Sequence, residues 1–449
     1  MWQATRRDFL RAVAAGAAAM ALPRWLSAEE KVRTRPNIVF IYTDDMGFGD
    51  PSCYGYKEVR TRSIDRLAGE GLRFTQFYVA SPICSPSRVG VTTGMFPGRW
   101  RINDYLHQRK ANHDHDQADW LDPKAPSLAR MLKQAGYATA HFGKWHMGGG
   151  RDVNDAPLPT AYGFDESLVS SHPLEGMGPA IDPKMPRHET TAAFVDRTID
   201  FIRRHRDGPF FVNLWPMDVH TPHAPDPELL PHYADAPSPH RNFDAVLEEY
   251  DYHIGRLLDF LRDAGLEENT LAVFSSDNGP EPSFEHERAA GLRGMKWSLY
   301  EGGIRTPLIV RWKGRVPAGK VDDATVIGGV DLLPTLCALA GAPLPPGVDF
   351  DGEDLSGALL GTPARRAKPL FWEYGRKPDY LKPREAGDRS PNVAVRDGKW
   401  KLLVNADGSG VELYDMAADP KETTNLAEKE PAVAKGLCDK ALAWRRSLP

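Results

Sequence analysis

Two short polar segments follow apolar runs that lie far apart in the chain. Asp44-Asp45 comes directly after residues 37–42, and Asp277-Asn278 follows residues 271–275. Three carboxylates and an amide oxygen are hard donors, which suit a hard divalent cation. Adjacent carboxylates without a cation repel each other and are costly to bury. Asp-Asp and Asp-Asn-Gly are also common turn sequences, so each pair taken alone indicates a solvated turn more often than a metal site.

A cysteine lies at the start of an expected helix. In Cys84-Ser-Pro-Ser-Arg88 the proline suits a first helical turn, which places residue 84 at the helix N-terminus beside Arg88. That position is electropositive and attracts anions. An unmodified cysteine there would be an activated thiolate. Because a single cysteine is usually a small buried apolar residue, the residue type alone does not establish a nucleophile.

Several cationic and imidazole side chains follow other expected strands or turns. Together, beside a metal ion, they would form a pocket for a doubly charged oxyanion. Taken singly, each is more often a surface residue. Two of them, His220 and His223, are histidines followed closely by proline. The set is Lys144, His146, His220, His223, Lys296 and Arg305.

The pattern of apolar runs predicts how these residues are positioned. Strands are expected at residues 37–42, 210–215, 271–275 and 306–312, and amphipathic helices at 127–135, 189–204 and 243–261. Alternating strands and helices predict an α/β fold with a large, mostly parallel sheet flanked by helices. Functional side chains gather beyond the carboxyl ends of such strands, where both acidic pairs are expected.

The pattern of expected elements changes after a Pro/Gly-rich stretch at residues 341–352. Short strands at 370–374, 392–395 and 399–404, and a helix at about 431–445, predict a smaller C-terminal α+β subdomain. We therefore expect a signal peptide at residues 1–28, a linker at 29–35, a catalytic domain at 36–365, and a C-terminal subdomain with a small antiparallel sheet and a helix at 366–449.

Composition excludes some functions and favours export. The 449 residues include 61 acidic and 56 basic side chains, a balance that does not favour nucleic acid as a partner. Arg6-Arg7 followed by Phe-Leu and an alanine-rich run resembles a bacterial twin-arginine signal, although an amphipathic first helix is an alternative. The sequence thus predicts an exported protein, periplasmic or secreted, with no membrane span after signal removal. Four widely spaced cysteines predict no disulfide.

Taken together, these segments resemble the type I sulfatases of the alkaline phosphatase superfamily. The likeness covers nearly the whole chain after the signal, and its most specific part is CSPSR-x4-TG from Cys84. Other matching text is Pro36 to Asp45, Gly136-Tyr137 to His146, Ser276-Asp277-Asn278-Gly279, Lys296 with Glu301-Gly-Gly-Ile-Arg305, and two C-terminal phrases, Val395 to Leu402 and Glu412 to Leu426.

The resemblance implies a role for each matching residue. Cys84 would be oxidised to formylglycine by a formylglycine-generating enzyme that recognises Cys84, Pro86 and Arg88. One hydroxyl of the hydrated aldehyde would attack sulfur, and the other would expel sulfate, so that one difficult reaction becomes two easier steps. One calcium ion would be bound by Asp44, Asp45, Asp277, Asn278 and residue 84. The other implied roles are formylglycine contacts for Arg88, Lys144 and His146, and sulfate binding for Lys144 and Lys296. A histidine followed closely by proline would protonate the leaving alcohol, with help from Lys296; we prefer His220 for this role, and His223 is the alternative.

The substrate implied by the resemblance is a sulfated small molecule or glycan. Loops at residues 107–120, 148–189 and 281–293 are expected to shape the mouth of the pocket, and their polar and aromatic content favours a sulfated sugar. His107, His113 and His115 could form a second metal site, but a solvated loop is the preferred interpretation. Alternative functions are a phosphomonoester or phosphonate-ester hydrolase of the same superfamily and a secreted carbohydrate-binding pseudoenzyme.

Overall fold

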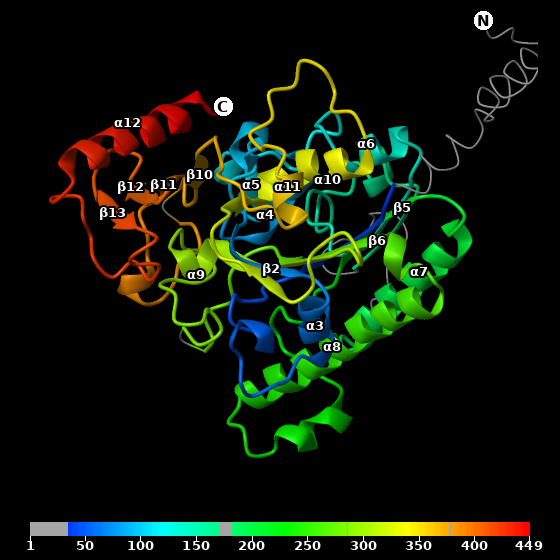
Figure 1. The fold of residues 1–449 in the computed structure, drawn as a ribbon. Helices are drawn as coiled ribbons and strands as arrows, with labels where there is room; N and C mark the ends of the chain where they lie inside the picture. Colours follow the sequence, from blue (N-terminus) through cyan, green and yellow to red (C-terminus); the bar gives the residue numbers. More distant parts are fainter. Residues whose placement is uncertain (1–34, 171–181, 183, 285, 378) are drawn as a thin grey trace, which may run out of the picture.

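A nine-stranded sheet forms the centre of the molecule (Figure 1). The computed structural model describes residues 35–170, 182, 184–284, 286–377 and 379–449, so the expected signal peptide and nearly all of the linker lie outside the described residues. The strand order is β4-β3-β5-β1-β6-β7-β2-β8, with β9 also paired to β2. The strands are β1 (Asn37–Thr43), β2 (Leu72–Tyr78), β3 (Ala138–Gly143), β4 (Glu166–Val169), β5 (Phe210–Trp215), β6 (Thr270–Ser276), β7 (Arg305–Arg311), β8 (Lys320–Asp322) and β9 (Ile327–Gly328).

The sheet is mixed but mostly parallel, which confirms the predicted fold class. Strand β1 lies between β5 and β6 and is parallel to both. Strand β7 runs antiparallel to β6 and to β2. All seven residues of β1 and all seven of β6 are buried. Such continuous apolar runs are typical of strands covered on both faces, and they end together at one edge of the sheet.

Helices cover both faces of the sheet, as the alternating side chains of β1 require. Val39 and Ile41 pack with α3 (Arg62–Gly69), α7 (Glu189–His205) and α8 (His240–Asp263). Ile38 and Phe40 belong to the opposite core, which includes α4 (Cys84–Thr93), α6 (Leu128–Gln134) and α10 (Leu332–Ala340). Among the described residues, no helix has the length and apolar character needed to cross a bilayer.

A second sheet lies beyond the first, at the C-terminal end of the chain (Figure 1). It is antiparallel and consists of β10 (Leu370–Glu373), β11 (Val393–Asp397), β12 (Trp400–Val404) and β13 (Glu412–Asp415). Helix α12 (Pro431–Ser447) packs on it through a small apolar core that contains Val395 and Leu437. The remaining helices are α5 (Arg109–Asp114), α9 (Glu301–Ile304) and α11 (Ser356–Leu359), with short 3-10 turns at η1 (Ser52–Tyr54), η2 (Pro97–Trp100), η3 (Pro159–Tyr162), η4 (Pro227–Tyr233), η5 (Glu267–Asn269), η6 (Gly329–Asp331) and η7 (Ala386–Asp388).

The segment expected to be a solvated loop at residues 107–120 is partly helical. Helix α5 lies inside it and is organised by Asn112, whose side chain is buried. Its Oδ1 accepts a hydrogen bond from the backbone amide of His107 at 2.7 Å, and its Nδ2 donates to Asp119 at 2.9 Å. The histidines do not form a metal cluster: within the described ranges, the one group of three or more metal-ligating side chains that could hold an ion lies elsewhere.

Candidate active site

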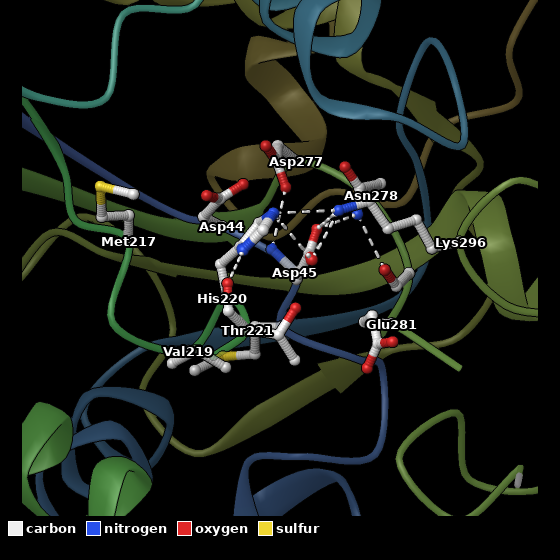
Figure 2. Close-up of polar contacts among 12 residues, drawn as sticks. Asp44, Asp45, Met217, Val219, His220, Thr221, Asp277, Asn278, Glu281 and Lys296 are labelled. Atoms are coloured by element: carbon white, nitrogen blue, oxygen red, sulfur yellow. Dashed lines mark hydrogen bonds and ion pairs between the residues drawn. The ribbon is translucent and has the colours of Figure 1, made fainter. Parts of the chain in front are cut away.

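The two acidic pairs meet at the carboxyl ends of β1 and β6. Asp44 and Asp45 directly follow β1, and Asp277 and Asn278 directly follow β6, its neighbour in the sheet. The backbone amide of Asp45 donates a hydrogen bond of 3.1 Å to Asp277 Oδ1, and Asn278 Nδ2 donates one of 2.7 Å to Asp45 Oδ1. All four side chains are buried, so the solvated-turn interpretation of these segments does not hold (Figure 2).

Three buried cations neutralise the three buried carboxylates. Arg88 Nη2 lies 2.6 Å from Asp277 Oδ2 and 3.3 Å from Asp44 Oδ1. Lys144 Nζ lies 2.7 Å from Asp44 Oδ2, and Lys296 Nζ lies 2.6 Å from Asp45 Oδ2. Buried charges persist only where they are paired and hydrogen-bonded, so the six groups form one interdependent cluster. It joins residues of α4, the turn after β3, and the segment before α9.

The carboxylates of this cluster differ in acidity. Burial by itself would raise the pKa of Asp44, but Lys144, His220 and Arg88 hold that pKa well below its usual value. The pKa of Asp45 is also lowered, because Lys296 and His220 outweigh burial. Burial raises the pKa of Asp277 to about 7, and the negative charge of Asp44 adds to this despite Arg88. Carboxylates whose pKa values differ this much within one cluster are characteristic of functional sites.

Residue 84 begins helix α4, as its sequence predicts. The hydroxyl of Ser85 accepts a hydrogen bond from the amide of Leu106 at 2.9 Å, and Ser87 Oγ lies 3.0 Å from the Tyr42 hydroxyl. The Cys84 side chain is buried, and burial raises the pKa of its thiol although Lys144 and Lys296 act in the opposite direction. The activated thiolate expected of an unmodified cysteine is therefore not what the structure favours, because loss of solvation outweighs the nearby cations.

Of the three histidines, His220 contacts the cluster, His146 lies near it, and His223 packs elsewhere. His220 Nε2 lies 3.4 Å from Lys296 Nζ and 3.6 Å from Asp45 Oδ2, whereas His146 is buried with Nε2 3.3 Å from the Leu106 carbonyl oxygen. Burial lowers the pKa of His220 to about 4, and it lowers that of His146 well below its usual value, so both are neutral near pH 7. His223 instead packs against Phe243 and Phe284.

Two arginines outside the predicted site residues, Arg288 and Arg187, support the backbone of cluster residues. Arg288 Nη2 donates to the carbonyl oxygen of Asp45 at 2.8 Å and pairs with the buried Asp50 at 2.8 Å. Arg187 Nη2 donates to the carbonyl oxygens of Met217 at 2.9 Å and His220 at 2.5 Å. Both act through backbone oxygens, which accept a hydrogen bond whatever the side chain, so no local motif reveals them.

The donor set fits a hard cation. The ligand atoms of Asp44, Asp45 and His220 lie within 4.8 Å of one another. Asn278 Oδ1 is buried and has no hydrogen-bond partner among the described residues, an arrangement that costs free energy unless something else binds this oxygen. Carboxylate and amide oxygens are the ligands of Ca2+ in proteins.

Comparison with known proteins agrees with the site geometry. Residues 36–342 match the Sulfatase family model, and residues 295–442 match the C-terminal model of N-sulphoglucosamine sulphohydrolase. The chain is 29% identical to an N-acetylgalactosamine-6-O-sulfatase of Bacteroides thetaiotaomicron, over 90% of this chain and 92% of that protein. It is 32% identical to human arylsulfatase A, over 89% and 85% of the two chains.

A solved structure from work on glycosaminoglycan metabolism by Bacteroides thetaiotaomicron has the same fold. The TM-score is 0.73 at 26% identity, with 90% of this chain and 98% of that chain covered. The match to the family model, the relatives and the fold all agree with the resemblance seen in the sequence. The chain belongs to the sulfatase family of the alkaline phosphatase superfamily, and it is a sulfuric ester hydrolase.

Proposed function

We propose that this sulfatase hydrolyses sulfate monoesters of a carbohydrate, with residue 84 as formylglycine and one bound calcium ion. The observation that carries the proposal is the position of Cys84. It begins α4 with its side chain buried, and its charge environment is set by Lys144, Lys296, Asp44 and Asp277. A nucleophile at this point would face both the expected cation site and the ammonium groups that can receive a sulfate.

Asp44, Asp45, Asp277, Asn278 and residue 84 would hold the calcium ion. The unpartnered Asn278 Oδ1 and the buried carboxylates support this ligand set. When bound, the ion supplies Lewis-acid stabilisation of negative charge on the hydrated aldehyde of residue 84. Arg88 holds the start of α4 beside Asp44 and Asp277 through its ion pairs with them. Its Nη1 also donates to the Lys144 carbonyl oxygen at 2.9 Å, which joins α4 to the turn after β3.

Lys144 and Lys296 would bind the sulfuryl oxygens. Each ammonium carries three donors. The contacts of Lys144 to Asp44 use no more than two of them, whereas Lys296 contacts both Asp45 and His220 and would turn a donor from Asp45 to the sulfate once a cation binds that carboxylate. The remaining donors can face an anion in a site from which water is largely excluded, where such contacts are strongest. Loss of one such donor typically costs about 10²–10³ in kcat.

His220 would protonate the leaving oxygen, with help from Lys296. His220 Nδ1 lies 2.6 Å from the Thr221 carbonyl oxygen, so a neutral ring has its proton on Nδ1 and its lone pair on Nε2. That lone pair faces Lys296 Nζ at 3.4 Å, which is positively charged and raised in pKa by Asp45 despite burial. A proton taken up from solvent on His220 Nε2 can be donated from that atom to the leaving oxygen, while the Lys296 ammonium beside it stabilises the negative charge that develops there.

A sugar is the favoured carrier of the sulfate. The relative from Bacteroides thetaiotaomicron is named as an N-acetylgalactosamine-6-O-sulfatase, and its similarity extends over 90% of this chain. Two half-buried aromatic rings border the cluster: Lys296 Nζ lies 6.0 Å from the Trp297 ring centroid, and the Tyr105 ring lies 6.5 Å from that of His146. Rings of this amphipathic kind suit the apolar face of a sugar.

The test compares matured protein with Cys84→Ala. We expect a peptide spanning residue 84 to show the mass of formylglycine, and sulfate release from sulfated hexosamine oligosaccharides to be lost in the variant. Matched phosphate and phosphonate esters should react much more slowly than the sulfate esters. Full turnover by Cys84→Ala, or faster turnover of the phosphorus esters, would contradict the proposal.

We further propose residues 36–365 as the catalytic domain and 366–449 as a subdomain that completes its core. Lys401 of β12 is buried and lies 3.0 Å from Glu301 and 2.8 Å from Glu422, so the two parts share a buried ion cluster. A chain that ends at residue 365 should consequently be insoluble or unstable when expressed. Recovery of a soluble, active 36–365 fragment would contradict this dependence.

A further inference from the structure

A tight turn beside the nucleophile presents an arginine that has no role in the machinery described so far. Gly148, Gly149 and Gly150 all have positive φ values, of 139°, 84° and 82°, and Arg151 follows with φ 57°. A left-handed backbone is uncommon for any residue but glycine, and residues held in it concentrate at ligand sites. The surrounding contacts fix the turn, because Gly148 pairs with Trp120 and the amide of Val153 bonds to the Gly150 carbonyl oxygen at 2.9 Å.

The next residue along also ties this turn to helix α5. Asp152 Oδ1 accepts a hydrogen bond of 3.0 Å from the backbone amide of Arg109, the first residue of that helix. Arg109 in turn forms ion pairs with Asp119 and Asp155. The backbone of Arg151 is therefore held from both sides, and its side chain leaves the turn in a defined direction.

The Arg151 guanidinium lacks a carboxylate partner within the described part of the chain. Its Nη1 is buried and forms no hydrogen bond there, and burial lowers its pKa because no ion pair offsets the loss of solvation. Other arginines of this region are paired: Arg101 lies 2.8 Å from Asp116, and Arg109 lies 2.9 Å from Asp119. A half-buried guanidinium without an anion is costly, which indicates a position kept for a ligand.

The neighbours of Arg151 lead directly to residue 84. The guanidinium carbon lies 6.0 Å from the centre of the Tyr105 ring, which is 5.2 Å from the His107 ring and 6.5 Å from the His146 ring. The intervening Leu106 is fixed to the nucleophile helix, since its amide donates to Ser85 Oγ at 2.9 Å. Arg151 lies close enough to Cys84 for a negative charge there to raise the pKa of the guanidinium.

A second polar atom near Arg151 also lacks a hydrogen-bond partner. His107 Nδ1 is buried without a hydrogen bond among the described residues. Burial, together with the charge of Arg151, lowers the pKa of His107, so the ring is neutral and can donate or accept one hydrogen bond. Tyr105 lies between these two groups and the catalytic cluster and offers a ring face to a sugar.

We propose that Arg151, with His107 and Tyr105, forms a second anion subsite, which binds a carboxylate or a second sulfate of the substrate beside the sulfate that is hydrolysed. The proposal rests on the proposed sulfatase action on a carbohydrate and narrows the substrate to glycans that carry more than one acidic group. A guanidinium suits both ligands, because its planar fork matches carboxylate and sulfate oxygens and it remains charged when half-buried.

The experiment uses four sulfated disaccharides and the matured full chain. One pair is a sulfated hexosamine linked to a uronic acid and the same compound with its carboxylate as the methyl ester. The other pair is a disulfated hexosamine disaccharide and its monosulfated form with a neutral partner sugar. For each pair, kcat/KM of the more anionic member is divided by that of the less anionic one. We expect at least one ratio to be about tenfold or more in the unsubstituted enzyme and to fall toward one in Arg151→Gln, mainly through KM.

The two pairs of disaccharides show whether the subsite binds a carboxylate or a second sulfate. A control variant shows whether the effect of Arg151→Gln comes from the subsite or only from the loss of one positive charge. Arg101→Gln removes one positive charge from an exposed ion pair and should leave both ratios within about twofold of the unsubstituted enzyme. Arg151→Lys should keep part of the preference. Ratios near one in the unsubstituted enzyme, or a preference that survives in Arg151→Gln, would overturn the subsite.

Failure of the proposed function gives a different result. A matured enzyme that releases sulfate from none of the four disaccharides would contradict the function. The subsite is then tested by calorimetric titration with the same disaccharides. Weaker binding of the more anionic members by Arg151→Gln than by Arg101→Gln supports the subsite, and equal binding overturns it.

Discussion

Arg88 Nη2 lies 2.6 Å from Asp277 Oδ2, and neither side chain is exposed to solvent. The pair joins helix α4 to the end of β6, across 189 positions of the chain. The same guanidinium reaches Asp44 at 3.3 Å. Arg88 thus couples the nucleophile segment to both carboxylates of the neighbouring strand ends, and the position of residue 84 depends on this contact.

Replacement of Arg88 by Met should destabilise the fold. The substitution keeps most of the volume but leaves Asp277 and Asp44 without one of their buried partners, which typically costs about 3–5 kcal/mol. We expect a clear fall in the free energy of unfolding, measured by urea denaturation of the unmodified protein. Arg66→Met is the matched control, since Arg66 pairs with Asp259 at a partly exposed site and its replacement should cost less than about 1 kcal/mol. Equal losses in the two variants would show that the Arg88 contact is not structural.

Conversion of Cys84 should require an unfolded chain. Cys84, Pro86 and Arg88, the residues that a formylglycine-generating enzyme would recognise, are all buried in α4. An enzyme cannot reach them unless the helix leaves the core. We expect incubation of folded, unmodified protein with such an enzyme and oxygen to leave the mass of the residue 84 peptide unchanged, whereas a synthetic peptide covering residues 80–95 is converted. Equal conversion of folded protein and peptide would contradict this expectation.

Replacement of His220 should affect substrates according to their leaving group. A sugar alkoxide needs a proton as it leaves, while a nitrophenolate hardly does, so His220→Ala should lower kcat/KM about 10²–10⁴-fold for a sugar sulfate and far less for 4-nitrophenyl sulfate. His223→Ala is the control, because its ring packs on Phe243 and Phe284 and not on the cluster. It should affect stability and show no dependence on the leaving group. The opposite pattern would make His223 the general acid.

Much of this site can be predicted from the positions at which the expected strands end. Asp44 and Asp277 were expected at carboxyl strand ends, and parallel strands bring such ends to one edge. That β1 and β6 are neighbours could not be inferred from chain order, since β2 to β5 come between them in sequence. The strands that the patterns missed include β2, whose seven residues have mixed burial, and β8, which is short and lies at the edge of the sheet. Their sequences lack a long apolar run, and tertiary pairing decides their structure.

Other features depend on packing that no local pattern encodes. The high pKa of the Cys84 thiol results from burial, which the expected electropositive helix start did not take into account. Arg288 and Arg187 act on backbone oxygens, so their partners become visible only in three dimensions. Arg151 is of interest because its buried Nη1 has no hydrogen-bond partner among the described residues. A missing partner cannot be recognised from the sequence.

Calcium should stabilise the protein through Asn278. A cation that binds the folded chain alone raises the melting temperature in proportion to the logarithm of its concentration above the Kd. We expect chelation to abolish sulfate release, calcium to restore it, and Asn278→Leu to require about 10–100 times more calcium for half-maximal thermal stabilisation. Asn405→Leu, at a surface turn, should keep the calcium response of the unsubstituted protein. An unchanged response in Asn278→Leu would exclude its amide oxygen as a ligand.

A buried carboxylate on the opposite face of the sheet from helix α4, Asp251, should make the stability of the fold depend on pH. Asp251 of α8 accepts hydrogen bonds from the backbone amides of Ser63 and Ile64 at the start of α3, both at 2.9 Å. Burial nevertheless raises its pKa to about 6, because these contacts do not fully offset the loss of solvation. An acid whose pKa is higher in the folded chain than in the unfolded chain stabilises the fold when protonated, and this contribution is lost as pH rises from about 4 to about 6.

The contribution of Asp251 can be isolated with an isosteric variant. Asp251→Asn keeps an oxygen acceptor for α3 and removes the titration, so it should be stabilised relative to the unsubstituted protein at pH 7.5 by up to about 3 kcal/mol and much less at pH 4.5. Melting temperatures of both proteins across this range give the comparison. Asp259→Asn, at a partly exposed position on the same helix, is the comparison variant for the loss of a carboxylate charge. If the Asp251 difference is the same at both pH values, the carboxylate is ionised throughout and its pKa is not raised.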